Sequence, residues 1–455
     1  MNLIRQIMPA ILLTGMALPA AAQTHATDTL RLSREECVSI ALQESPTIKV
    51  ANLEVKRMDY SKKEILGSLF PSIDFSGAYQ RSIELQSLSM NMGGQTQSIK
   101  MGTDNNWNFG FGAAMPLVNA QLWKSISISD TQILQTMEEA RASKLDLVNN
   151  INKAYYALLL AIDSRKVIQQ NYDLAKFNAD LYKKQFEQGT ASEYDVLRTS
   201  VQVSNIEPEL LQADISVKQC SLQLKVLMGM DAAMTVMPNI TLQDMKQEMY
   251  GYTLEGNYNL SGNTTLRSLD LNQKLAKQNV TLQKFAWIPT LSTQFNIAWS
   301  AMSNGNALKH QQFNPYSNVA LALSVPIFSG CSKLHKVRQA EVQVKELELQ
   351  RENLVNSLDM QVQLALDNIN REVRQISSSE EGVKQAAKAH EIMQKSFEIG
   401  AATYLDLRDS EVAYTSSQLA YLQSIYNYLV SSSELDVLLG KEEALGISAD
   451  NNISK

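Results

Sequence analysis

The chain is poor in the residues that most often carry enzyme chemistry. Among 455 residues there are four histidines and three cysteines. They are scattered, and no pair has the spacing of a metal site. No GK[ST] phosphate loop, H-E-x-x-H or G-x-S-x-G pattern occurs either. We therefore predict no enzymatic activity, no metal and no cofactor, and expect Cys37, Cys220 and Cys331 to be buried free thiols.

An excess of positive charge and long apolar runs are also missing. The 41 Lys and Arg residues face 47 Asp and Glu residues, which gives a net charge of −6. This balance argues against nucleic acid as a partner. Beyond the first residues no run of about 18 apolar residues exists, so no transmembrane helix is predicted. If the protein enters a membrane, it has to do so with β-strands.

The first 22 residues resemble a secretory signal peptide. Arg5 supplies positive charge, residues 7–18 form a short apolar core, and the alanines at 20–22 fit a cleavage site. No cysteine follows that site, so lipid attachment is not predicted. We expect residues 1–22 to be removed during export from the cytoplasm.

Two copies of one pattern follow each other along the chain. The matched segments, in order, are 45–49 with 263–267, 69–73 with 287–291, 115–118 with 325–328, and 186–189 with 397–400. An aspartate, Asp195 or Asp406, stands six residues after the glycine that ends each last segment. Ordered matches of this kind indicate a tandem duplication. We predict repeats over 23–238 and 264–440, a connecting segment over 239–263 and a tail over 441–455.

Four segments alternate between apolar and polar residues with period two, as β-strands do. They span 72–85, 106–117, 290–300 and 318–327. A soluble, half-buried sheet would give the same alternation. Tryptophan placement favours a membrane instead, because Trp107, Trp123, Trp287 and Trp299 all lie at or just beyond strand ends, where aromatic girdles meet lipid headgroups.

Two very long helices are predicted, over 121–187 and 332–398. The first contains no glycine or proline and carries apolar or small residues every seven positions from Ile126 to Tyr182. This pattern is typical of a coiled coil, and at 1.5 Å per residue each helix could reach about 100 Å. Glycines Gly189 and Gly400 follow these helices and suit a left-handed C-terminal cap.

Four strands cannot stand alone in lipid, because two open edges would leave backbone groups unpaired. Two copies would give eight strands, a barrel that side chains nearly fill. Three copies would give twelve strands and leave an aqueous bore. The predicted fold is therefore mixed and mainly α: an internally duplicated chain that contributes four strands to a trimeric 12-stranded outer-membrane barrel, continued by a long helical coiled-coil tunnel.

The ordered set of duplicated strand pairs, helical hairpins and F-E-x-G turns resembles the TolC-type outer-membrane efflux proteins over essentially the whole mature chain. The resemblance implies a homotrimer in outer-membrane lipid that conducts substrates passively across the periplasm. Its partners would be a periplasmic adaptor protein and an inner-membrane pump. It also implies that 239–263 and the tail form an equatorial belt.

The same resemblance assigns roles near the second hairpin turn. Asp406 and Asp409 match positions where aspartates ring the closed tunnel mouth, and their mutual repulsion should raise their pKa values. Without the resemblance, Asp406 would be read as a solvated aspartate near a helix N-terminus. The turn residues Gly189, Thr190, Gly400 and Ala401 would line the grooves where adaptor hairpins dock.

The chain departs from the family at the latch that closes the tunnel. Asp195 occupies the expected carboxylate position, but Phe397 stands in place of a tyrosine and Ala402 in place of an arginine. We expect a differently built latch, in which Arg198 or Arg408 could substitute. The alternative interpretation of the whole chain is a periplasmic coiled-coil adaptor or scaffold.

Overall fold

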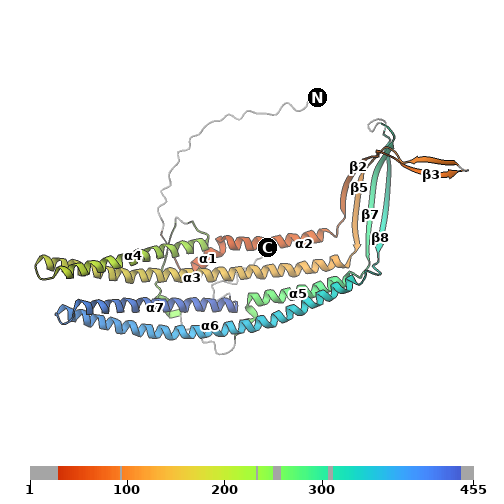
Figure 1. Ribbon diagram of the computed structural model, residues 1–455. Coiled ribbons are helices and arrows are strands. Elements are labelled where there is room, and N and C mark those ends of the chain that lie inside the picture. The colour runs from red at the N-terminus through yellow and green to blue at the C-terminus, as the bar shows by residue number, and fades with distance from the viewer. Residues whose placement is uncertain (1–28, 93–94, 232–233, 249–257, 306–310, 442–455) are drawn as a thin grey trace, which may run out of the picture.

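The computed structural model describes residues 29–92, 95–231, 234–248, 258–305 and 311–441. The predicted signal peptide, most of the predicted tail and part of the connecting segment lie outside these ranges. The molecule is long and thin, with two helical hairpins at one end and a β-sheet at the other (Figure 1). The prediction of a mainly helical chain that contributes one four-stranded sheet is confirmed.

Helices form most of the described chain. They are α1 (Arg34–Glu44), α2 (Pro46–Gly67), α3 (Ala120–Glu187), α4 (Glu193–Met228), α5 (Thr264–Phe285), α6 (Ser332–Glu398) and α7 (Tyr404–Leu439), with short 3-10 turns η1 (Asp244–Glu248) and η2 (Leu260–Gly262). The N-termini are set by local chemistry: Ser33 and Glu36 form a reciprocal capping box, and Pro46 stands where its missing N–H costs nothing. The bounds of α3 and α6 agree with the sequence prediction to within one residue.

The main sheet is antiparallel, in the order β2–β5–β7–β8. Its strands are β2 (Ser72–Arg81), β5 (Asn105–Val118), β7 (Thr290–Ser303) and β8 (Asn314–Ser324). The predicted bounds of three strands were wrong. The strand predicted over 290–300 continues as β7 to Ser303. The strand predicted over 72–85 ends at Arg81, where its partner β5 begins, and the strand predicted over 318–327 starts at Asn314 and stops before Pro326, which has no N–H to donate.

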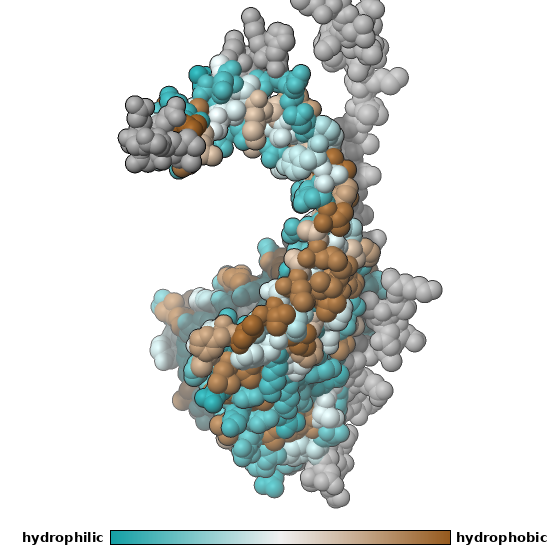
Figure 2. Space-filling model, turned by 90° about the vertical axis from the view of Figure 1, so that its right-hand side faces the viewer, coloured by the Kyte–Doolittle hydropathy of each residue, from teal (hydrophilic) through white to brown (hydrophobic). Residues whose placement is uncertain are grey.

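Strand register places most of the large apolar residues on one face. Phe75 pairs with Phe111, Phe111 with Ile297, and Phe295 with Val319, so the odd-numbered residues of all four strands lie together. The opposite face carries the even-numbered residues, which are mainly small or polar. Figure 2 shows a band of hydrophobic residues between two more hydrophilic parts of the chain. The sheet therefore has one apolar and one polar surface.

Two further strand pairs were not predicted. Strands β3 (Gln86–Met92) and β4 (Gln95–Met101) form an antiparallel hairpin between the segments 72–85 and 106–117 that were predicted to be strands. Strands β1 (Thr29–Leu32) and β6 (Thr235–Pro238) pair in parallel beside the middle of the helices. The β3–β4 pair was missed because more than half of its residues are polar and its alternation is short. Strands β1 and β6 were missed because four residues show no clear periodicity.

The core lies in the middle of the helical part, where α1, α3, α4 and α7 meet the β1–β6 pair. Its fully buried members include Ile151 and Leu158 of α3, Leu224 of α4, and Ile425 of α7. Cys37 is buried among them, as expected. Cys220 is half-buried and Cys331 is exposed, so the expectation that all three thiols are buried was wrong for these two.

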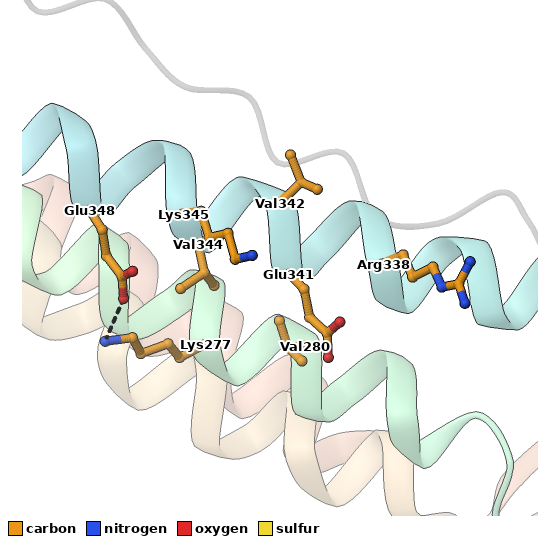
Figure 3. A pocket seen from close by; sticks show the side chains of 8 residues that line it. All are labelled: Lys277, Val280, Arg338, Glu341, Val342, Val344, Lys345 and Glu348. Atoms are coloured by element: carbon orange, nitrogen blue, oxygen red, sulfur yellow. Dashed lines mark ion pairs between the residues drawn. The ribbon is translucent and has the colours of Figure 1, made fainter.

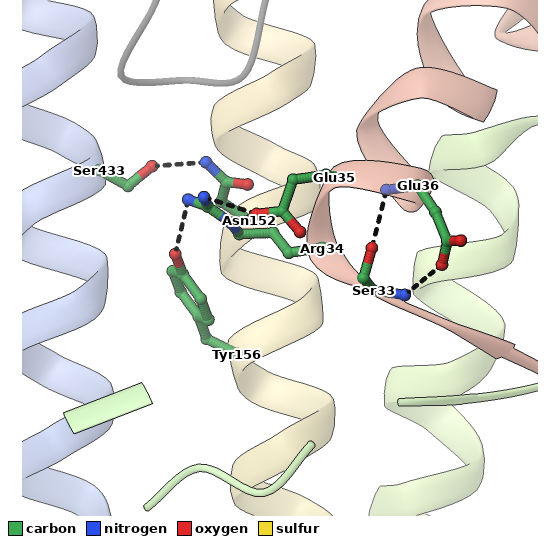
Figure 4. A network of polar contacts seen from close by, with 7 residues as sticks. All are labelled: Ser33, Arg34, Glu35, Glu36, Asn152, Tyr156 and Ser433. Carbon is green, nitrogen blue, oxygen red and sulfur yellow. Dashed lines mark hydrogen bonds and ion pairs between the residues drawn. The ribbon is translucent and has the colours of Figure 1, made fainter. Parts of the chain in front are cut away.

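Polar contacts cross this core and join the two hairpins (Figure 4). Arg34 donates to the Tyr156 hydroxyl of α3 at 3.5 Å. Asn152 of α3 donates to the Ser433 hydroxyl of α7 at 3.3 Å, and Ser433 in turn donates to Asn149 at 2.9 Å. Apolar packing and hydrogen bonds together fix α7 against α3 at mid-height.

Candidate functional site

The two hairpin turns, between α3 and α4 and between α6 and α7, are built alike. Gly189 and Gly400 have φ angles of +74° and +76°, a left-handed conformation that glycine adopts without strain. The amide of the next residue closes each turn: Thr190 donates to Gln185 O at 2.8 Å, and Ala401 donates to Ser396 O at 2.7 Å. The left-handed caps predicted at both glycines are confirmed.

The aspartate six residues after each glycine caps the next helix. Asp195 accepts from the Ser192 hydroxyl at 2.6 Å, and Asp406 accepts from the Thr403 hydroxyl at 2.6 Å and from the Thr403 amide at 2.9 Å. These contacts form reciprocal capping boxes at α4 and α7. The repeated spacing seen in the sequence therefore has a local structural cause.

The two predicted gate residues differ in their surroundings within one chain. The hydrogen bonds from Thr403 hold the pKa of the Asp406 carboxyl below its ordinary value. Asp409, three residues further along α7, is exposed. A ring of carboxylates needs several copies of the chain, so the gate, and the raised pKa values expected there, stay predictions.

One of the predicted latch residues joins the two hairpins through a tyrosine that sequence reasoning missed. The Arg198 guanidinium of α4 lies 5.2 Å from the ring centroid of Tyr404 on α7. Tyr182 of α3 packs edge-on against the same ring at 5.6 Å, and Phe397 lies at 6.3 Å. We call these four residues the tip clasp. Its sequence signal was an aromatic residue directly after the second turn, opposite a tyrosine of the seven-residue series.

The remaining latch candidate, Arg408, lies behind the clasp, where its Nε atom is buried and has no hydrogen-bond partner among the described residues. Glu411 follows one turn later and is only 7% exposed. Burial raises the pKa of the Glu411 carboxyl to about 7, although the nearby Arg408 acts in the opposite direction. Sequence reasoning did not single out Glu411.

The four tryptophans divide between the two ends of the sheet. Trp107 packs at a tilt against Tyr79 and Trp299 stacks on Phe109, near the end that carries the β3–β4 hairpin. Trp123, in the first turn of α3, and Trp287, before β7, lie near the helical end and are 50% and 44% exposed. This placement fits two aromatic belts, which stay a prediction.

Shallow grooves run along both sides of the helical part near the sheet. One lies between α5 and α6, where Lys277 pairs with Glu348 at 3.6 Å and Val342 points outward (Figure 3). Another lies between α2 and α3 and is lined by Val50, Ala51 and Ala140 among others. Each groove borders one lateral edge of the molecule.

The described residues contain neither a membrane-spanning helix nor a cluster of metal-ligating side chains. None of their helices is long and apolar enough to cross a bilayer. No group of three or more His, Cys, Asp or Glu side chains within these ranges is placed to hold a metal ion.

Comparison with known proteins identifies the family. The sequence model of the outer membrane efflux protein family matches residues 37–230 and 258–441, so the chain belongs to this family. The outer membrane protein TolC of Vibrio cholerae is 20% identical over 356 residues, which cover 76% of this chain and 80% of that protein.

Solved structures share the fold. CusC, described as forming a transmembrane channel, has a TM-score of 0.72 at 17% identity and covers 95% of this chain and 99% of its own. The CmeC outer membrane channel of Campylobacter jejuni has a TM-score of 0.69 at 16% identity, with 90% and 85% covered.

The family settles the broad function. The chain is an outer-membrane channel component of a Gram-negative efflux or secretion system, and the resemblance stated from the sequence is confirmed. Members of this family are channels rather than enzymes. The alternative interpretation as a periplasmic adaptor or scaffold is therefore wrong.

Proposed function

We propose that three copies of this chain close edge to edge into a continuous duct through the outer membrane and the periplasm. The proposal rests on one observation: in the sheet, in the helices next to it and in the helices near the tip, the elements lie side by side in a single row with two free edges. The sheet runs β2–β5–β7–β8, the helices near it run α2–α3–α5–α6, and those toward the tip run α4–α3–α7–α6. Elements of the first repeat form one lateral edge, and β8 and α6 form the other.

Both edges carry groups that need a partner. All ten residues of β2 are exposed, as are nearly all of β8, and neither strand has a second neighbour among the described residues. Exposed apolar side chains follow the edge helices: Leu197, Val201, Leu211, Ile215 and Val226 on α4, and Val342, Leu349, Met360 and Leu364 on α6. Pairing β8 with β2 of the next copy, and α6 with its α2 and α4, would satisfy them.

Three copies are the favoured number because twelve strands leave a bore that eight would fill. The apolar face of the sheet would meet lipid and the polar face would line the channel. The 68 residues of α3 give a helical stem about 100 Å long. Residues 1–22 would direct export without lipid attachment.

The hairpin tip would form the periplasmic mouth of the duct. Asp406 and Asp409 of three copies would place six carboxylates in a narrow throat that attracts cations. The tip clasp would hold the second hairpin to the first when the mouth is closed. The turns around Gly189, Thr190, Gly400 and Ala401 would receive hairpins of an adaptor protein, which links the duct to an inner-membrane pump.

The test is single-channel recording of the purified protein in planar bilayers. The wild type should conduct, and trivalent cations added on the tip side should block the current. Replacing Asp406 and Asp409 by Ala should abolish that block. The control exchanges Glu193 and Glu398 for Ala, which removes the same charge near the tip and should leave block intact. Absence of conductance would overturn the channel assembly, and block that persists without Asp406 and Asp409 would overturn the gate.

A further inference from the structure

The contact between α3 and α7 changes character along its length. At mid-height it is mainly apolar, with Ile151, Leu158 and Ile425 fully buried, and the buried Asn152 and Ser433 side chains are hydrogen-bonded to each other. Behind the tip it contains polar side chains that are almost as well buried: Asn178 is 8% exposed and Glu411 is 7% exposed. We call this stretch, Asn178 with Arg408 and Glu411, the polar seam.

The geometry of the two helices places these residues at the same level. Helices α3 and α7 run antiparallel. Tyr182 of α3 packs on Tyr404 of α7 near the tip, and Asn152 of α3 donates a hydrogen bond to Ser433 of α7 much farther from the tip. Glu411 lies seven residues after Tyr404 on α7, and Ala175 lies seven residues before Tyr182 on α3. In antiparallel helices these equal steps place Glu411 opposite Ala175, which is 3% exposed. Asn178 lies between these two levels on the same buried face of α3.

None of the three side chains is fully satisfied. Asn178 Nδ2, Arg408 Nε and Glu411 Oε1 are buried and have no hydrogen-bond partner within the described ranges. Burial without partners costs a carboxylate far more than a neutral carboxylic acid. The closed seam therefore favours the protonated form of Glu411, whereas separation of the helices would hydrate the carboxylate and favour its ionised form.

Charged and titratable groups surround the seam on every packed element. Arg408 and Tyr404 lie on α7 itself, Tyr182 on α3, Arg198 on α4, and His390 on α6. Arg408 favours ionised Glu411, but burial outweighs it. His390 stacks on Tyr414, and burial lowers the pKa of its imidazole. If opening of the tip exposed His390 to water, low pH would favour the open state. This pH dependence is opposite to the one expected from Glu411.

We propose that the polar seam is a proton-dependent lock, in which protonated Glu411 holds the α6–α7 hairpin against α3 and its ionisation accompanies opening of the tip. The inference rests on the proposed role of the tip as a gated mouth. It concerns the seam behind the clasp rather than the aspartates predicted to ring the throat. Glu411 is a positioning residue here, since it acts through the hairpin and does not touch the cargo.

The pH range follows from linkage. Burial raises the pKa of Glu411 from its ordinary 4.5 to about 7 in the closed seam. Below the ordinary value the group is protonated in both states and has no effect. Between the two values each pH unit raises the ratio of open to closed hairpin up to about tenfold per protomer. Above the raised value the ratio levels off.

The experiment records open probability in planar bilayers from pH 5 to pH 8. The wild type should open increasingly up to about pH 7 and then reach a plateau. Glu411→Gln cannot ionise and should stay at the acid level throughout. The matched control, Glu398→Gln, removes one exposed carboxylate at the end of α6 and should keep the wild-type response. Glu411→Leu gives a second non-ionising variant, and trimer migration and circular dichroism report whether each variant folds.

Hydrogen exchange on the wild-type trimer provides an independent measurement. After correction for intrinsic rates, amides over 174–182 and 404–412 should exchange at least tenfold faster at pH 7.5 than at pH 5. Equal protection at both pH values would overturn the lock, as would an unchanged pH response in Glu411→Gln. A wild type that forms no channel at all would instead contradict the proposed function, so the two failures are distinguishable.

Discussion

At the scale of single residues, two glycines set how the 3-10 turn η2 approaches the end of α7. Gly440 caps α7 with a φ of +67°. A Cβ at Gly440 would lie 2.0 Å from the carbonyl oxygen of Gly262, which no relaxed structure tolerates. Because the obstructing atom belongs to the backbone, rotation of a side chain cannot relieve the clash. The position thus requires glycine both for conformation and for space.

We expect Gly440→Ala to destabilise the helical part more than Gly189→Ala. Both changes place alanine in the left-handed region, which costs about 1–2 kcal/mol. Only Gly440 meets a neighbouring backbone, since nothing lies within 4 Å of a Cβ at Gly189. The measurement is the temperature at which helical circular dichroism is half lost. Equal temperatures for the two variants would contradict the close approach.

Residue patterns predicted some of these positions but not their roles. The aspartate six residues after each glycine was visible as a repeat, and Ser192 and Thr403, three residues before Asp195 and Asp406, complete a pattern typical of a helix cap. The resemblance directed attention to a gate and a latch instead. Tyr404 and Glu411 could not be identified, because their neighbours Tyr182, Arg198 and Asn178 are more than 200 residues away in the sequence. Such contacts depend on which helices lie side by side in the fold. The periodicity of the sequence does not reveal that arrangement.

At the scale of elements, the two hairpins are separate units joined differently at mid-height and at the tip. The middle combines apolar packing with the Asn152–Ser433 contact. The tip depends on the clasp around Tyr404. Contacts of this second kind are weaker, since a cation over an aromatic ring contributes about 0.5–1 kcal/mol at a partly exposed site.

We predict that Arg198→Ala raises the ratio of open to closed tip by about two- to fivefold per protomer, because it removes that cation–ring contact. Tyr404→Phe keeps the ring and should behave like the wild type, whereas Tyr404→Ala should resemble Arg198→Ala. Open times in planar bilayers at constant pH report the change. A phenylalanine variant as leaky as the alanine variant would show that the ring contact is not what holds the hairpins.

Helices and strands were predicted best where the same sequence pattern continued over many residues. The long helices lack glycine and proline for most of their length, so their ends at Glu187 and Glu398 were found correctly. The ends of β2 and β8 were not, because alternation continues past the last paired residue and only the partner strand determines where pairing stops. The β3–β4 hairpin does alternate over Ser87–Met92, but most of its residues are polar and the alternation is short, so it was not recognised as a strand pair.

At the scale of the whole molecule, the open edges determine how copies assemble. Leu211 of α4 and Leu349 of α6 are 57% and 68% exposed and belong to opposite edges. A lysine at either position would have to bury its charge in the interface between copies without a partner, at a cost of at least 1–3 kcal/mol.

We therefore expect Leu211→Lys and Leu349→Lys to lower the fraction of trimer at least tenfold at a fixed protein concentration. Gln212→Lys adds the same charge one position away on α4, off the apolar stripe, and should assemble normally. Size-exclusion chromatography with light scattering in detergent measures the fraction. Normal assembly of both leucine variants would contradict the proposed edges.

The sheet has one apolar face and two edge strands with unpaired backbone groups, and these features have a consequence for biogenesis. A freshly exported single chain cannot shelter that surface by itself, because β2 and β8 each have only one neighbouring strand in the described part of the chain, and Phe75, Val319 and Leu321 are largely exposed. Correct folding must then depend on association with other copies of the chain, or with a chaperone, before the chain aggregates. Yield should consequently vary with the rate of synthesis, and overproduction should favour aggregated material over finished channels.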